Sequence, residues 1–89
     1  MLFVVTLTHP PELCIANAAY KEQGKKWIEN MRGLAEKTGV KIHGAYVSPV
    51  EHTYYFALEA ENYKAISDFL SPPMRTLHTG RVSPVMPLE

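Results

Sequence analysis

The 89-residue sequence has a single cysteine, no excess of charge of either sign and no long apolar run. The lone cysteine, Cys14, excludes a disulfide within the chain and fits a reducing compartment. Nine basic and nine acidic side chains cancel, which disfavours nucleic-acid binding through phosphate contacts. No apolar run approaches the roughly 20 residues that cross a bilayer, and the first residues lack the basic start of a signal peptide. We therefore expect a cytoplasmic protein that binds neither nucleic acid nor membrane.

The sequence does have the composition of an ordinary globular protein, with 46% hydrophobic and 20% charged residues. Its length fits one domain that spans residues 1–89. A domain of this size buries only about 60 to 65% of the surface of its unfolded chain. We therefore expect that a partner subunit adds to its stability.

Hydrophobic periodicity predicts the order strand, helix, strand, strand, helix, strand. The apolar run Leu2–Thr8 is stopped by His9-Pro10-Pro11, which cannot continue a ladder. Residues Glu12–Thr38 are helical in pattern, and an unbroken helix there would be about 40 Å long, longer than the strands beside it. We therefore expect a break near Gly24, with a short first segment that carries Cys14. The remaining strands and the second helix are expected at Lys41–Val47, Thr53–Glu59, Asn62–Leu70 and Gly80–Met86.

This βαββαβ order predicts an α+β ferredoxin-like sandwich. Its sheet would be antiparallel, with four strands in the order 4-1-3-2 and both helices on one face. Pro84 indicates that the last strand lies at an edge of the sheet, because proline cannot donate to a neighbouring strand. The other face should alternate apolar with polar residues if it met water. Instead the first strand is apolar on both sides, with Phe3 and Val5 on one and Leu2 and Val4 on the other. We therefore expect a homodimer, or a higher homo-oligomer, that covers the open face.

The stretches Met1–Val5, Leu70–Met74 and Val82–Pro87, together with this order of elements, resemble the dimeric α/β-barrel superfamily. Its members include muconolactone isomerases, antibiotic-biosynthesis-type monooxygenases and several small families of uncharacterised function. The resemblance covers nearly the whole chain and depends on architecture and short apolar stretches. It implies two sheets packed face to face, which enclose a cavity in each subunit or one shared between subunits.

Three histidines are expected at one end of the predicted sheet. The first strand ends at His9, and its two antiparallel neighbours begin beside His52 and His78 at the same edge. Adjacent strands lie about 4.8 Å apart, so three imidazoles could bind one ion with bonds of about 2.0 Å. Cys14 is a candidate fourth ligand, with Glu12 or Glu51 as alternatives. A site of this kind suits nickel, copper, zinc or iron. The alternative is that these are ordinary loop histidines.

A ligand cavity is the second hypothesis that the sequence leaves open. The hydroxyl groups of Tyr46, Tyr54 and Tyr55, with Thr6 and Thr8, could line it and orient a small apolar or aromatic compound. The resemblance implies an isomerase or a cofactor-free monooxygenase, but the cavity side of the first strand offers no acid or base of the kind found in muconolactone isomerases. Aromatic residues in strands are also common in cores and interfaces. Whether the protein is an enzyme, or a ligand-binding or structural dimer, therefore stays open.

Overall fold

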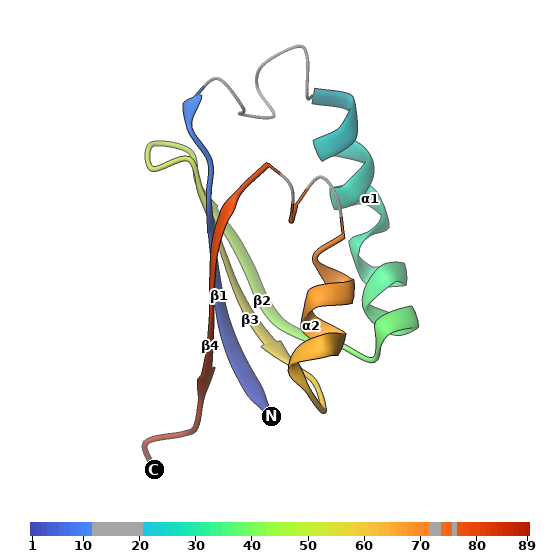
Figure 1. Cartoon of the computed structure of the whole chain (residues 1–89), viewed down its shortest axis with the longest axis vertical. Coiled ribbons are helices and arrows are strands. Elements are labelled where there is room, and N and C mark those ends of the chain that lie inside the picture. Colours follow the sequence, from blue (N-terminus) through green and yellow to red (C-terminus); the bar gives the residue numbers. More distant parts are fainter. Residues whose placement is uncertain (12–20, 72–73, 76) are drawn as a thin grey trace.

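A computed structural model of the chain describes residues 1–11, 21–71, 74–75 and 77–89. Figure 1 shows a layer of strands with the helices packed beside it. Within the described ranges, no helix is long and apolar enough to cross a membrane. The strands are β1 (Leu2–Thr8), β2 (Lys41–Ser48), β3 (Thr53–Glu59) and β4 (Thr79–Val85), and the helices are α1 (Lys21–Thr38) and α2 (Tyr63–Phe69).

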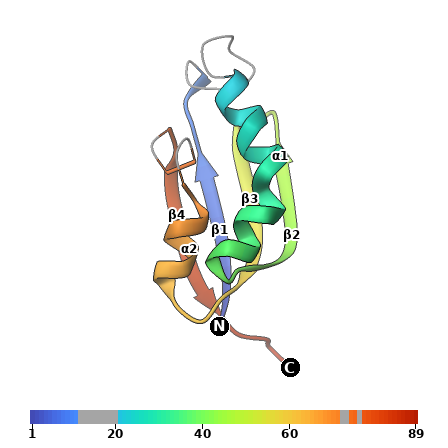
Figure 2. The same cartoon turned by 90° about the vertical axis from the view of Figure 1, so that its right-hand side faces the viewer.

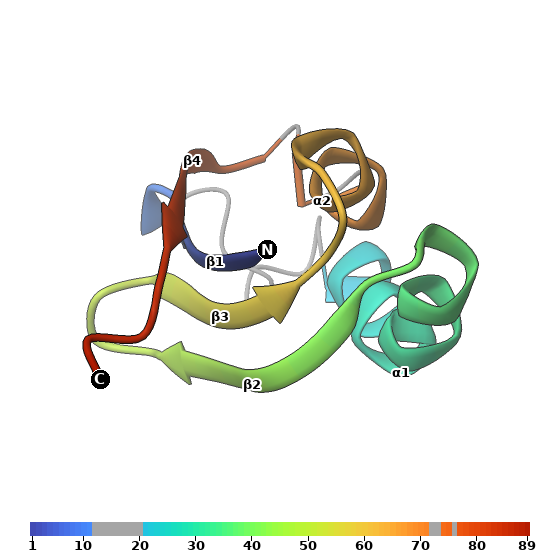
Figure 3. The same ribbon diagram turned by 90° about the horizontal axis from the view of Figure 1, so that it is seen from below.

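The strands form one antiparallel sheet in the order β2-β3-β1-β4, which is the predicted order 4-1-3-2 read from the other edge. Thr8, the last residue of β1, lies opposite Thr53 at the start of β3 and Thr79 at the start of β4. β4 is an edge strand, as Pro84 predicts. Both helices lie on one side of the sheet, and its other face is uncovered in the single chain (Figures 2 and 3). The predicted α+β ferredoxin-like fold is confirmed.

The hydrophobic core lies between the helices and the sheet face that they cover. Alternate residues of β1 and β3 are buried there, because successive side chains of a strand point to opposite faces. The indole ring of Trp27 in α1 packs edge to face on Phe56 of β3 and Phe69 of α2, with ring centres 5.9 and 5.4 Å away. The Asn62 side chain caps α2 by accepting a hydrogen bond from the backbone N–H of Ala65 at 2.9 Å. These contacts fix both helices on the sheet.

The helix α1 runs from Lys21 through Gly24 without interruption, so the chain does not break at Gly24 itself, and a break before Lys21 would fall outside the described residues. Glycine disfavours a helix interior by only about 1 kcal/mol relative to alanine, and packing of the helix on a core outweighs such a preference. Gly24 is in fact one of the buried residues of α1. The predicted first segment with Cys14 falls in residues 12–20, outside the described residues.

Candidate functional site

The end of β1 and the starts of β3 and β4 meet at one end of the sheet, the upper end in Figure 1. His9 directly follows β1, His52 directly precedes β3, and His78 directly precedes β4. The ring centres of His9 and His52 are 5.4 Å apart, and those of His9 and His78 are 4.8 Å apart. The structure therefore brings the three histidines into contact, with His9 touching both of the others.

His9 is the buried member of this cluster, with 4% of its surface exposed. Its Nδ1 and Nε2 atoms are buried, and neither has a hydrogen-bond partner among the described residues. A neutral imidazole has one donor and one acceptor, and a buried polar group left unpaired costs about 1 to 3 kcal/mol. Burial, with a smaller contribution from His52, lowers the pKa of His9 from its ordinary value of 6.5. His9 is therefore neutral at pH 7, the form in which imidazole binds metal ions.

His78 is held in one tautomer by a backbone carbonyl. Its Nδ1 atom lies 3.0 Å from the carbonyl oxygen of Met74. Because a carbonyl only accepts, this hydrogen bond assigns the ring hydrogen to Nδ1 and leaves Nε2 unprotonated in the neutral ring. Metal-binding histidines usually donate their other ring N–H in this way, which orients the ring.

His52 adopts a backbone conformation that is uncommon for a residue with a side chain. Its φ angle is 52°, in the left-handed region. Its N–H donates to the carbonyl of Pro49 at 3.3 Å, and its own carbonyl accepts from the N–H of His9 at 3.1 Å. Its Nδ1 atom is buried, and no described residue forms a hydrogen bond with it. The turn thus keeps an imidazole at a position that suits glycine better.

Two threonines fix the strand ends that carry His9 and His52. The Thr53 hydroxyl donates to the carbonyl of Glu51 at 2.9 Å, and it lies 3.2 Å from the Thr8 hydroxyl. Since the Thr53 hydroxyl has one hydrogen, already used, Thr8 is the donor between the two. The end of β1 is therefore tied through side chains, as well as backbone, to the turn before β3.

The histidine rings are close together but are not arranged as a metal site in the described part of the chain. His9 packs edge to face on both neighbours, with interplanar angles of 69° to His52 and 83° to His78. In the described part of the chain, no three His, Cys, Asp or Glu side chains form a group arranged to hold a metal ion. The predicted fourth ligand, Cys14, lies outside that part.

The Tyr54 ring packs against the histidine cluster, whereas the sequence predicted that Tyr54 lines a ligand cavity. It is 7% exposed and lies on the helix-covered face. Its ring centre is 6.1 Å from that of His9 and 5.5 Å from that of His78. The signal for this placement is its spacing of two residues from Phe56, because alternate residues of a strand share a face.

The other predicted cavity residues lie on the open face of the sheet. Thr6, Tyr55 and Tyr46 pair across β1, β3 and β2 and form one row. Thr8 follows on the same side of β1. The Tyr55 hydroxyl donates to the Glu51 carboxylate at 2.8 Å, and this hydrogen bond raises the pKa of Tyr55. The five predicted residues therefore do not surround one space in the single chain, because Tyr54 faces the opposite side.

Comparison with protein families gives one finding for the whole chain. Residues 1–89 match the family model described as "Domain of unknown function (DUF3303)". No curated protein matches the sequence. Since the family description states no activity, function has to be inferred from the residues themselves.

Proposed function

The chain belongs to the DUF3303 family, and we propose that it binds one transition-metal ion through the imidazoles of His9, His52 and His78. The observation that carries this proposal is the buried position of His9 in contact with two other imidazoles. Within residues 1–11, 21–71, 74–75 and 77–89, neither of its ring nitrogens takes part in a hydrogen bond. Buried side-chain polar atoms without a partner are exceptions in folded proteins and call for an explanation. A metal ion bound to His9 supplies one.

The spacing of the rings supports a shared ion. Three imidazoles around a tetrahedral ion, with metal–nitrogen bonds of about 2.0 Å, have ring centres about 5 Å apart. The separations of 5.4 Å for His9–His52 and 4.8 Å for His9–His78 lie on either side of that value. Binding then requires the rings to rotate so that their nitrogens meet, because they now pack edge to face.

The fourth ligand decides what the ion does. Imidazole nitrogen suits zinc, copper, nickel and iron. If the Cys14 thiolate completes the site, the ion is bound tightly and has a closed coordination shell, whereas a water molecule in that place leaves a position open for catalysis. Cobalt(II) absorption separates the two cases, since a thiolate ligand gives a near-ultraviolet charge-transfer band that is lost in Cys14→Ser.

Metal content and calorimetry test the proposal. Tag-free protein purified without chelators is analysed by elemental mass spectrometry, then stripped and titrated with Zn²⁺, Ni²⁺ and Cu²⁺. His43→Gln is the matched control, because His43 hydrogen-bonds the exposed Glu59 carboxylate at 2.8 Å, outside the cluster. Wild type and this control should bind one ion per chain, and His9→Phe should bind none. Equal binding by wild type and His9→Phe, or no binding by wild type, would refute the proposal.

A homodimer and a cytoplasmic location belong to the same proposal. Among the described residues, nothing covers the open face of the sheet (Figure 3). The large hydrophobic side chains of Val4, Tyr55 and Val85 are exposed on this face. A sheet face that met water would be expected to carry polar side chains at such positions. A second copy placed face to face would bury them. The lone Cys14 fits the reducing conditions of the cytoplasm.

A second candidate function is a ligand cavity between two such faces, supported by the row of hydroxyl groups from Thr6, Tyr46 and Tyr55. The ring of Tyr46 lies over Gly44, where an added Cβ would come within 2.7 Å of it. The resemblance to isomerases and cofactor-free monooxygenases makes a small apolar or aromatic compound the expected ligand. Tyr55→Phe should weaken binding of such compounds without changing the dimer mass; if no aromatic compound binds the dimer, this candidate fails.

A further inference from the structure

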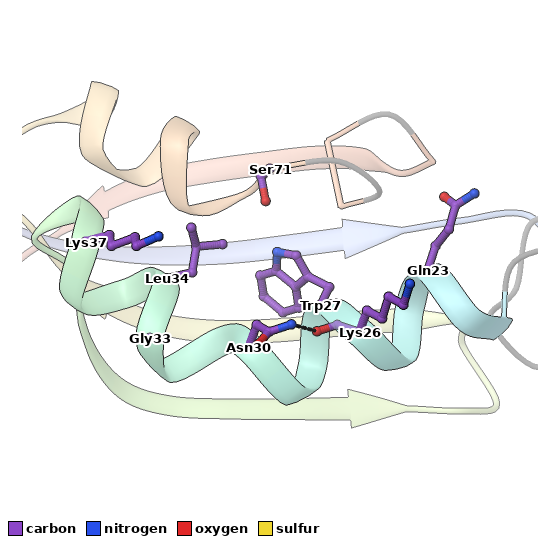
Figure 4. Close-up of a pocket in the computed structure, with 8 residues that line it drawn as sticks. All are labelled: Gln23, Lys26, Trp27, Asn30, Gly33, Leu34, Lys37 and Ser71. Carbon is purple, nitrogen blue, oxygen red and sulfur yellow. Dashed lines mark hydrogen bonds between the residues drawn. The ribbon is translucent and has the colours of Figure 1, made fainter.

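A groove of about 560 Å³ follows α1 on the side that faces the end of α2. Figure 4 shows Trp27 in the middle of the groove, with Lys37 and Lys26 on either side of it and Ser71 opposite. None of the three histidines of the cluster lines this space. The lining residues are Gln23, Lys26, Trp27, Asn30, Gly33, Leu34, Lys37 and Ser71.

The lining combines apolar surface with positive charge. Trp27 and Leu34 supply the apolar part, and Lys26 and Lys37 supply two cations without any carboxylate among the lining residues. Within the described part of the chain, neither lysine forms an ion pair. A ligand with an apolar body and a negative group would complement both features.

Trp27 adds a hydrogen-bond donor without an acceptor. The residue is 5% exposed, and its Nε1 atom is buried with no hydrogen-bond partner in the part of the chain that the structure describes. The indole N–H can only donate, and buried donors in folded proteins nearly always have an acceptor. In Figure 4 the nitrogen edge of the ring is turned toward Ser71, across the groove. A buried donor without an acceptor therefore lies beneath the lining of this groove.

Gly33 is a second unexplained feature of the same groove. It lies within α1, where glycine is less favourable than alanine. A Cβ added to it would meet no atom within 4 Å, so packing does not require glycine here. Its visible effect is to leave the groove open. The unpaired N–H of Trp27 and the glycine at position 33 both lower the stability of the fold, and both occur at this groove. Residues that lower stability without a structural reason are concentrated at functional sites.

We propose that this groove binds an amphipathic carboxylate. The apolar body lies on Leu34 and Trp27, in the space that Gly33 leaves open. The carboxylate lies between Lys37 and Ser71 and accepts a hydrogen bond from Nε1 of Trp27. Because Nε1 is now covered, the side chains above it must turn aside when the ligand binds. The site is separate from the histidine cluster and does not depend on a metal.

The single tryptophan provides the test, since its indole N–H gives one resonance in a ¹H–¹⁵N spectrum. The full chain is titrated with octanoate, and with 1-octanol as the uncharged probe. Octanoate should move the indole resonance downfield in a saturable way, and 1-octanol should bind more weakly by about tenfold. Lys37→Gln should weaken octanoate binding by about three- to tenfold, since it removes one charge-assisted contact.

Two further variants complete the test. Gly33→Met should abolish the shift by filling the groove, and Lys25→Gln should leave it unchanged, because Lys25 is an exposed lysine of α1 outside the lining. The proposal is overturned if octanoate causes no saturable shift or binds no better than 1-octanol. It is equally overturned if Lys37→Gln, an exposed substitution that leaves the core intact, binds octanoate as wild type does.

Discussion

Replacement of His9 by phenylalanine tests whether the buried imidazole serves stability or metal binding. In metal-free protein at pH 7, His9→Phe should raise the free energy of unfolding. The neutral imidazole leaves one donor and one acceptor unpaired, at about 1 to 3 kcal/mol each, and the phenyl ring has neither. The larger ring crowds His52 and His78, which costs about 1 to 3 kcal/mol. With the middle of each range, the two relieved groups outweigh the crowding by about 2 kcal/mol, and Tm rises by about 4 to 8 °C per kcal/mol in a domain of this size.

Urea unfolding followed by Trp27 fluorescence measures this difference. In chelator the phenylalanine variant should be the more stable protein. With Zn²⁺ at about 100 times its Kd, wild type should gain about 2.7 kcal/mol and the variant nothing, so that the order of stability reverses. His43→Gln should stay within about 0.5 kcal/mol of wild type in chelator and should gain as much from zinc as wild type. If the variant is less stable than wild type in chelator, the imidazole nitrogens have partners in solution and the reasoning is wrong.

The buried imidazole of His9 should also make the stability of the wild-type protein depend on pH. Burial, and secondarily His52, holds the pKa of folded His9 below the value of 6.5 expected in the unfolded chain. Below about pH 6.5 the unfolded chain therefore binds a proton that the folded chain does not, and stability falls as the pH decreases toward the folded pKa. His9→Phe lacks this loss. The free energy of unfolding of His9→Phe should consequently exceed that of wild type by a growing amount as the pH is lowered from 7 to about 5.5. A difference that stays constant over this range would contradict a lowered pKa for His9.

Four further substitutions have defined outcomes. Val4→Glu places a charge in the open sheet face and should convert a dimer to a folded monomer, measured by sedimentation equilibrium. Gly39→Ala should lower the free energy of unfolding by about 1 kcal/mol, since its φ is 76°, whereas Gly33→Ala should raise it by about 0.5 to 1 kcal/mol in the same urea assay. His52→Gly should leave the fold as stable as before, because it relieves the positive φ, yet weaken zinc binding in calorimetry.

The architecture was predictable because its signals are periodic and local. The apolar run Leu2–Thr8 and the aromatic-rich run Thr53–Glu59 predict both strands with the bounds that the structure has. The sheet order then follows from topology rules. The helix is continuous at Gly24 itself, since glycine propensity is a weak preference that docking on a core overrides. Ring orientation in the histidine cluster could not be predicted, because it depends on rotamers and not on register.

The two faces of β1 lead to a prediction about both dimerisation and metal binding. Phe3, Val5 and Leu7 point into the core, and His9 continues that series and is buried too. Val4 belongs to the opposite, open face. If metal is bound on one side of the sheet and the second subunit on the other, neither depends on the other. Monomeric Val4→Glu should then bind zinc as wild type does, and a loss of zinc on dissociation would place a ligand in the partner subunit.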